Sequence, residues 1–167
     1  MKKMTEDNVK AAFAGESQAH MKYLAFAGAA ERESLPNVAR LFRAASFSEQ
    51  VHATNHLNAM AGVGKTAANL GAAIDGETFE VAEMYPAYIA VANDQQEKVP
   101  ARWFNAALAA EKVHAGLYTK AKESVAAGKD LGYLPVHVCG QCGFTVEGEA
   151  PDKCPVCGAA KDRFTRF

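Results

Sequence analysis

The sequence predicts a mainly α-helical chain: a four-helix bundle with one long crossover, followed by a small metal-binding module of short strands and loops. Three observations support this. Residues from about 5 to 127 are rich in alanine and place apolar residues at three- and four-residue steps, as amphipathic helices do. From Pro135 onward the chain is dense in Gly, Pro and Cys. The four cysteines all fall in this last stretch. We therefore expect two domains, residues 1–130 and 131–167.

Four helices are expected, over about residues 5–34, 36–61, 77–97 and 100–127. Short turns join the first pair and the last pair, which makes the members of each pair antiparallel neighbours. A looser connection over residues 64–76 contains three glycines and is long enough to cross the bundle. Pro86 lies inside the third helix, where it is expected to bend the helix or disturb its hydrogen bonds.

The charge balance argues against several classes of partner. The 18 Lys and Arg residues nearly match the 19 Asp and Glu residues, so nothing electrostatic favours nucleic acid or an anionic membrane. No run approaches the roughly 18 apolar residues of a membrane span. The N-terminus turns acidic within a few residues and lacks the apolar stretch of a signal peptide. We expect a cytoplasmic protein, in which paired Cys-x-x-Cys motifs bind metal rather than form disulfides.

Each expected helix carries a carboxylate near the middle of its apolar stripe. Glu16, Glu49 and Glu111 interrupt the stripes of the first, second and fourth helices. The third helix offers Glu80 and Glu83 on one face. A buried, unpaired carboxylate costs several kcal/mol, so five of them in one core need a counter-charge. Two divalent cations would supply it.

Histidines complete the expected ligand set. A His three residues after a Glu lies on the same helical face, and the pattern Glu-x-x-His occurs twice. A Glu from each of two helices, with Glu-x-x-His from each of the other two, is the di-iron arrangement of helical bundles. The candidate ligands are Glu16, Glu49, His52, Glu80, Glu83, Glu111 and His114. Mixed carboxylate and imidazole ligands favour iron or manganese over a structural zinc.

Other polar residues of the stripes have plainer interpretations. His52 and His56 are spaced as in some zinc enzymes, but the glutamate of such a motif is missing. His20 and His56 are better explained as core or supporting histidines. Tyr23 and Tyr85 are candidate hydrogen-bond donors to ligand carboxylates, with ordinary buried tyrosines as the alternative.

The cysteines form two knuckles, Cys139-Gly-Gln-Cys142 and Cys154-Pro-Val-Cys157. Two such knuckles present four thiolates to one tetrahedral metal. A glycine follows the second cysteine of each knuckle, which lets the backbone turn so that amide hydrogens can face sulfur. The spacing alone does not distinguish an iron site from a structural zinc ribbon.

Together these motifs resemble the rubrerythrin family, over essentially the whole chain. The matching stretches are residues 15–19, 49–52, 76–86 and 111–114 and the two cysteine knuckles. The resemblance implies a ferritin-like di-iron domain followed by a rubredoxin-like domain. It implies that Glu49 and Glu111 bridge two irons, that one or both of His52 and His114 are ligands, and that the four-cysteine site holds iron, with zinc as the other possible occupant.

The resemblance also implies a peroxidase that reduces hydrogen peroxide to water in defence against oxidative stress. Electrons would come from a rubredoxin or an NAD(P)H-linked reductase and pass through the FeS4 site. Glu83 is the candidate for carrying a proton to the leaving oxygen. The bundle is about 30 Å long and the linker is short, so one chain is expected to hold its two metal sites far apart. The resemblance implies a head-to-tail homodimer, with exchange of helices between chains as a further option. The alternatives are an iron-oxidising or iron-handling ferritin relative and a non-enzymatic adaptor with a zinc ribbon.

Overall fold

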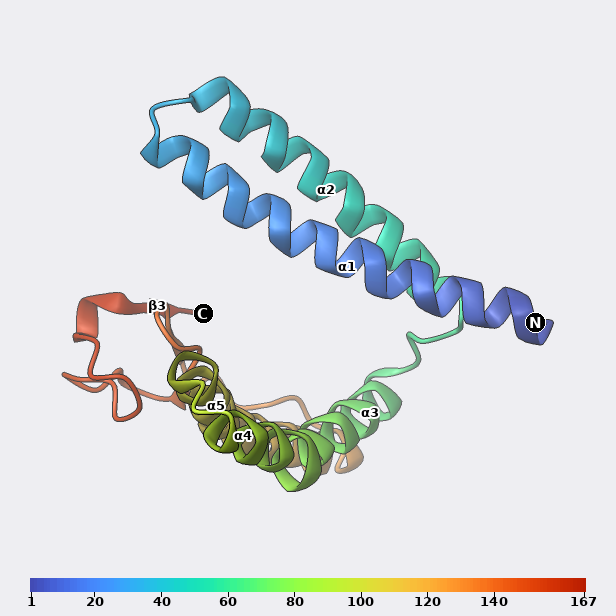
Figure 1. Cartoon of the computed structure of the whole chain (residues 1–167). Coiled ribbons are helices and arrows are strands. Elements are labelled where there is room, and N and C mark those ends of the chain that lie inside the picture. Colours follow the sequence, from blue (N-terminus) through green and yellow to red (C-terminus); the bar gives the residue numbers. More distant parts are fainter. The chain divides into compact units, whose positions relative to one another are not determined.

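The computed structural model describes all 167 residues, with four helical runs followed by a three-stranded antiparallel sheet (Figure 1). The chain divides into two compact units, Met1–Gly64 and Lys65–Phe167. The predicted fold class, mainly α-helical with a small cysteine-bearing module at the C-terminal end, is confirmed. No helix combines the length and the apolar character that crossing a membrane requires.

The first unit is a helical hairpin of α1 (Lys3–Arg32) and α2 (Pro36–Ala59), which lie side by side in Figure 1. In the turn Ser34 adopts a left-handed conformation, with φ at 61°, and Pro36 begins α2, where its missing N–H is not needed. The buried side chains of the hairpin are small: Ala27, Ala30, Ala39, Ser46 and Ala53. Small side chains let the helices approach closely, and large ones such as Phe47 stay exposed on this unit.

The second unit begins with one continuous helical run. α3 (Thr66–Phe79), a π-helical turn η1 (Glu80–Met84) and α4 (Tyr85–Asp94) follow one another without a break. A short turn then leads into α5 (Lys98–Ala126), which packs along the whole run. The two units therefore contain one helical hairpin each.

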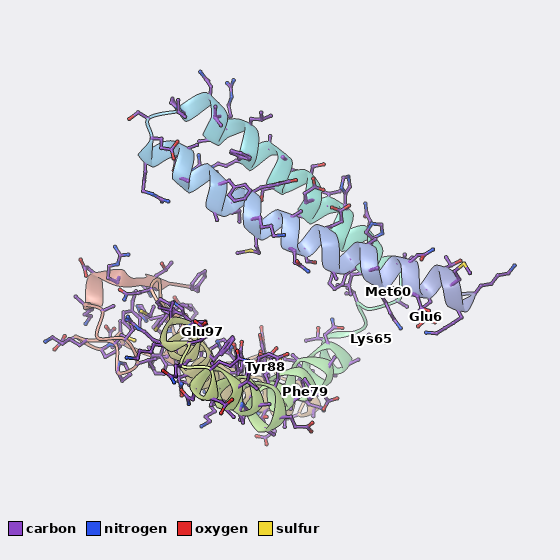
Figure 2. All side chains as sticks on the ribbon, viewed as in Figure 1. Glu6, Met60, Lys65, Phe79, Tyr88 and Glu97 are labelled. Atoms are coloured by element: carbon purple, nitrogen blue, oxygen red, sulfur yellow. The ribbon has the colours of Figure 1, made fainter.

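The connection between the two hairpins is shorter than the sequence suggests. α3 begins at Thr66 rather than near Glu77, so only Met60–Lys65 lies between α2 and α3 (Figure 2). The expected long crossover over residues 64–76 is a helix for most of its length. A glycine inside a helix costs only about 1 kcal/mol relative to alanine. Packing against α5 and the alanines of α3 outweigh this cost at Gly71 and Gly76.

Pro86 accounts for the π-helical turn. The Tyr85 N–H bonds to the Glu80 carbonyl, five residues back, and Pro86 has no N–H to donate. In a regular α-helix the proline ring would clash with the carbonyl four residues earlier, and the wider turn relieves that clash. The expected disturbance at Pro86 thus takes the form of one extra residue in the turn. The extra residue shifts the helical register, so the side chains that face α5 follow a different spacing before and after the turn.

The C-terminal module is a sheet of β1 (Val136–Cys139), β2 (Thr145–Glu147) and β3 (Phe164–Arg166), in the order β2-β1-β3. A 3-10 turn, Lys161–Arg163, leads into β3. Both strand pairs are antiparallel, which brings the knuckle before β2 and the start of β3 to the same end of β1.

The module lies against α5 of its own unit. Lys120 on α5 donates to both carboxylate oxygens of Glu147, at 2.8 and 2.7 Å. Further back along α5, His114 contacts the Thr145 hydroxyl at 2.8 Å. The structure thus places the cysteine module directly beside the candidate ligand residues of α5.

Candidate metal centres

A first group of ligand atoms lies on the hairpin of α1 and α2. Glu16 belongs to α1, and Glu49 and His52 lie one turn apart on α2. His52 Nδ1 is 2.9 Å from Glu49 Oε2 and 3.8 Å from Glu16 Oε1. One ligand atom from each residue lies within 4.8 Å of the others. We call these three residues the first triad.

A second group repeats this arrangement on the other unit. Glu77 belongs to α3, and Glu111 and His114 lie one turn apart on α5. His114 Nδ1 is 2.7 Å from Glu111 Oε2 and 3.8 Å from Glu77 Oε1. The three ligand atoms again lie within 4.8 Å of one another. We call these residues the second triad.

The triads contain most of the residues that the sequence predicts as ligands. The predicted ligands that join a triad are Glu16, Glu49, His52, Glu111 and His114. Glu77, which is not among the predicted ligands, takes the remaining place in the second triad. Glu80 is close enough to Glu111 and His114 to interact with both electrostatically. Glu83 is exposed on η1 and joins neither triad, so its role stays a prediction.

The spacing to a tyrosine is the signal that could have found Glu77. In the first hairpin Tyr23 follows Glu16 by seven residues, and in the second Tyr85 follows Glu77 by eight. The π-helical turn lies between Glu77 and Tyr85 and accounts for the extra residue. Glu77 is thus the counterpart of Glu16, and Glu80 is an addition found only in the second hairpin.

Three carboxylates of the second unit, Glu77, Glu80 and Glu111, lie close enough to interact electrostatically. Burial, then hydrogen bonding to Glu111 and the charges of Glu111 and Glu80, raise the pKa of Glu77 to about 7. Burial and the charge of Glu111 also raise the pKa of Glu80, and His114 opposes that shift. Burial and the repulsion between neighbouring carboxylates both disfavour the charged forms of Glu77 and Glu80. A divalent cation would displace the shared proton and supply the missing charge, so the donor set fits a bound metal.

The two candidate tyrosines lie in aromatic clusters on the helices of the triads. Tyr23 is half-buried among phenylalanines of the first hairpin. Burial, then the charges of Glu80, Glu111 and Glu77, raise the pKa of Tyr85, which keeps its hydroxyl protonated and able to donate. The donor role of both tyrosines toward ligand carboxylates stays a prediction.

The other two helical histidines take no part in the triads. His20 Nδ1 lies 2.9 Å from both the carbonyl oxygen and the hydroxyl of Ser46, which is fully buried. This contact links α1 to α2 and fits the packing role that the sequence suggests. His56 is half-buried near the end of α2 and belongs to no ligand group.

The four cysteines converge in the C-terminal module. The Sγ atoms of Cys139 and Cys157 are 3.7 Å apart, and those of Cys142 and Cys154 are 3.6 Å apart. A tetrahedral ion with metal–sulfur bonds near 2.3 Å separates its sulfurs by about 3.8 Å. The cysteines form no disulfide, and their spacing therefore fits one tetrahedral ion without rearrangement.

Backbone amides support ionised thiols in this module. Burial opposes ionisation of Cys139, but hydrogen bonds from the backbone N–H groups of Gln141 and Cys142 help to lower its pKa to about 7. Gly143 and Gly158, with φ at 80° and 77°, allow the knuckles to turn in this way. In the metal-free protein, burial instead raises the pKa of Cys142 and Cys157. Metals bind the thiolate form, so a bound cation would displace the protons of these two thiols.

Comparison with known proteins agrees with both centres. The rubrerythrin family model matches residues 7–122, and the model for the rubrerythrin rubredoxin-like domain matches residues 137–165. The chain belongs to the rubrerythrin family. It is 41% identical to Rubrerythrin-2 of Clostridium acetobutylicum, over 98% of this chain and 97% of that protein. It is 36% identical to nigerythrin of Nitratidesulfovibrio vulgaris, over 98% of this chain and 86% of that protein.

Solved structures extend the similarity to the fold. A mixed-valence structure of nigerythrin matches with a TM-score of 0.56 and 35% identity, over 98% of this chain and 86% of that one. Nigerythrin has also been solved in a fully reduced, all-ferrous state. Family membership and the donor geometry together assign to this chain a rubrerythrin di-iron site and a rubredoxin-like four-cysteine site. Membership of this family makes the chain an oxidoreductase.

Proposed function

We propose that this chain is a non-haem di-iron peroxidase that reduces hydrogen peroxide to water with electrons relayed through an iron in its four-cysteine site. The observation that carries the proposal is the contact between the second triad and the four-cysteine module on α5. When bound, the iron pair supplies two electrons to one O–O bond, and two protons complete the conversion of peroxide into two waters. A one-electron site beside it suits the relay of those electrons.

The protein's own groups supply ligands, charge balance and protons. The triad carboxylates and histidines hold the metal pair. Glu83 is exposed on the π-helical turn and belongs to no triad, so it is free to exchange protons with solvent. It is the proposed proton carrier to the leaving oxygen.

The proposed assembly is a head-to-tail homodimer in which the hairpins are exchanged between chains. In this proposal, the first triad of one chain and the second triad of its partner chain make one di-iron site. The six residues Met60–Lys65 reach about 20–25 Å when extended. A 24-residue helix such as α2 is roughly 36 Å long. The connection is therefore too short to run back along the whole of α2, as a long crossover within one bundle would have to do. This favours completion of the site by a second copy of the chain.

Complementation between two inactive variants tests the exchange. Glu49→Gln disables the first triad and Glu111→Gln disables the second. If the hairpins are exchanged, refolding the two variants together produces mixed dimers with one intact and one doubly altered site. Roughly a quarter of the wild-type number of active sites should then return. No return of activity, with mixed dimers demonstrated by mass spectrometry, would show that each site is built from a single chain.

The proposed electron source is a rubredoxin or an NAD(P)H-linked reductase that reduces the iron of the four-cysteine site. The proposed location is the cytoplasm, where a reducing environment keeps the four cysteines unpaired. Measuring the reduction of this iron by each class of donor, from the loss of its visible absorption, distinguishes the two sources.

Stopped-flow mixing of the fully reduced protein with hydrogen peroxide, and separately with dioxygen, tests the reaction itself. We expect faster oxidation by peroxide, with reoxidation of the four-cysteine iron following that of the di-iron site. Cys157→Ser serves as the matched control. It should remove the four-cysteine iron and steady turnover from the donor but leave a single turnover at the di-iron site. Equal or faster reaction with dioxygen would instead support an oxidase or an iron-handling role.

A further inference from the structure

The imidazole of His114 is held from both sides. Its Nδ1 faces the two carboxylates of the second triad and lies 2.7 Å from Glu111 Oε2. Its Nε2 lies 2.8 Å from the hydroxyl of Thr145. Thr145 is the first residue of β2 in the four-cysteine module and is only 3% exposed. We infer that Thr145 is a positioning residue for His114, through which the four-cysteine module sets the metal affinity of the di-iron site. This inference rests on the proposed function in taking the second triad as half of that site.

The hydroxyl of Thr145 has a defined direction. It donates its one hydrogen to the Gly143 carbonyl at 3.1 Å, so toward His114 it can only accept. His114 therefore donates through Nε2–H to Thr145. Its Nδ1 is left to face Glu111 and Glu77, where a cation would bind. A ligating histidine commonly donates its other N–H to a fixed acceptor, which orients the ring and raises its basicity.

The same turn that presents two cysteines also fixes this acceptor. Gly143 directly follows Cys142, adopts φ at 80°, and donates its N–H to the Cys139 carbonyl at 2.9 Å. The backbone of Thr145 is paired with Val138 across the two strands. The Gly143 carbonyl and the Thr145 hydroxyl are thus held by the knuckle and the sheet together. An ordered knuckle is therefore a condition for an ordered His114.

The first triad has no equivalent of Thr145 within its own unit. The His52 side chain is 49% exposed, against 29% for His114, and its Nδ1 carries its contacts to Glu49 and Glu16. The support of the ring by the four-cysteine module is thus a feature of the second triad. This support depends on the threonine that lies three residues after Cys142.

Metal titration of the full chain tests the inference without relying on turnover. The protein carries iron in its four-cysteine site, its di-iron site is emptied, and Mn²⁺ binding is followed by EPR, because Mn²⁺ prefers carboxylate and imidazole to thiolate. Thr145→Val keeps the shape of the side chain and removes the hydroxyl. We expect Mn²⁺ affinity to fall about 10- to 100-fold, the usual loss for a supporting partner of a ligand. Thr145→Ser keeps the hydroxyl and should restore wild-type affinity.

Glu147→Gln is the matched control for docking of the module. It weakens the other contact between β2 and α5, to Lys120, without touching His114. Its Mn²⁺ affinity should stay near wild type, and the visible spectrum of the four-cysteine iron should be unchanged in every variant. Thr145→Ala, which removes the same hydroxyl, replaces the Val variant if that spectrum is lost.

Three outcomes would overturn the inference. They are unchanged affinity in Thr145→Val, an equal loss in Glu147→Gln, and loss of the four-cysteine iron spectrum in both Val and Ala variants. The last would make Thr145 a residue of the cysteine fold alone. Peroxide turnover of the wild type is measured separately. Its absence would refute the proposed function and leave the affinity result standing.

Discussion

The two hairpins present nearly the same ligand geometry on different helical backbones. In each, the histidine Nδ1 lies within about 3 Å of the preceding glutamate, a hydrogen-bond distance, and 3.8 Å from a glutamate of the neighbouring helix. Each also has a phenylalanine seven residues before its Glu-x-x-His, Phe42 in one and Phe104 in the other. The repeat therefore extends beyond the ligands to aromatic residues of the same helices.

The departures from this repeat lie in the second unit. α1 is a regular helix of 30 residues, whereas the run from α3 to α4 contains a π-helical turn. That turn accompanies two additional carboxylates, Glu80 and the exposed Glu83. The four-cysteine module also docks on this unit. The repeat accounts for metal binding, and the departures account for the proposed entry of protons and electrons.

The largest expected effect comes from removing the triad glutamate that precedes the histidine in either hairpin. If the triads contribute equally, Glu49→Gln and Glu111→Gln should each lose the iron pair and more than about 100-fold in peroxide turnover, beyond the loss typical of supporting residues. Iron content and steady-state turnover measure this, and the spectrum of the four-cysteine iron should be unchanged in both. A variant that keeps a full iron pair would show that the two hairpins are not equivalent in binding.

A smaller effect is expected where the hairpins differ. Glu83→Ala should keep the iron pair and lose about 100-fold in turnover, because it removes the proposed proton carrier. Glu77→Gln should weaken metal binding instead, because Glu77 belongs to the second triad. Iron content distinguishes the two variants, and rescue of Glu83→Ala by small carboxylic acids would support the proton role. Unchanged turnover in Glu83→Ala would refute that role.

The sequence is sufficient to predict the helices, the cysteine knuckles and most of the residues that meet in the triads, because each rests on a local pattern. Glu49 with His52, and Cys139 with Cys142, are fixed by spacing along one element. The long connection is mispredicted because its glycines interrupt the pattern without interrupting the helix. Glu77 is missed because the π-helical turn adds a residue, which shifts the helical face by about 100°. Thr145 meets His114 only through packing of the module on α5, which no local pattern reveals.

The smallest expected effect is a pH dependence confined to the second unit. The pKa of Glu77 is raised from 4.5 to about 7 in the folded, metal-free protein. Between these values the folded chain binds more protons than the unfolded chain, so its stability falls as pH rises through this window. The Tm of metal-free protein should therefore decrease from about pH 4.5 to 7, by on the order of a few degrees.

Glu77→Gln tests the source of that slope, because a neutral amide has no proton to lose. Its Tm should vary less with pH across the window than that of the wild type. Glu123→Gln, which removes an exposed carboxylate from α5, is the control and should keep the wild-type slope. Mn²⁺ should reverse the slope in the wild type, because metal displaces the proton and binds more tightly as pH rises. If the metal-free slope persists in Glu77→Gln, the shared proton lies elsewhere in the cluster and the asymmetry between the hairpins does not depend on Glu77.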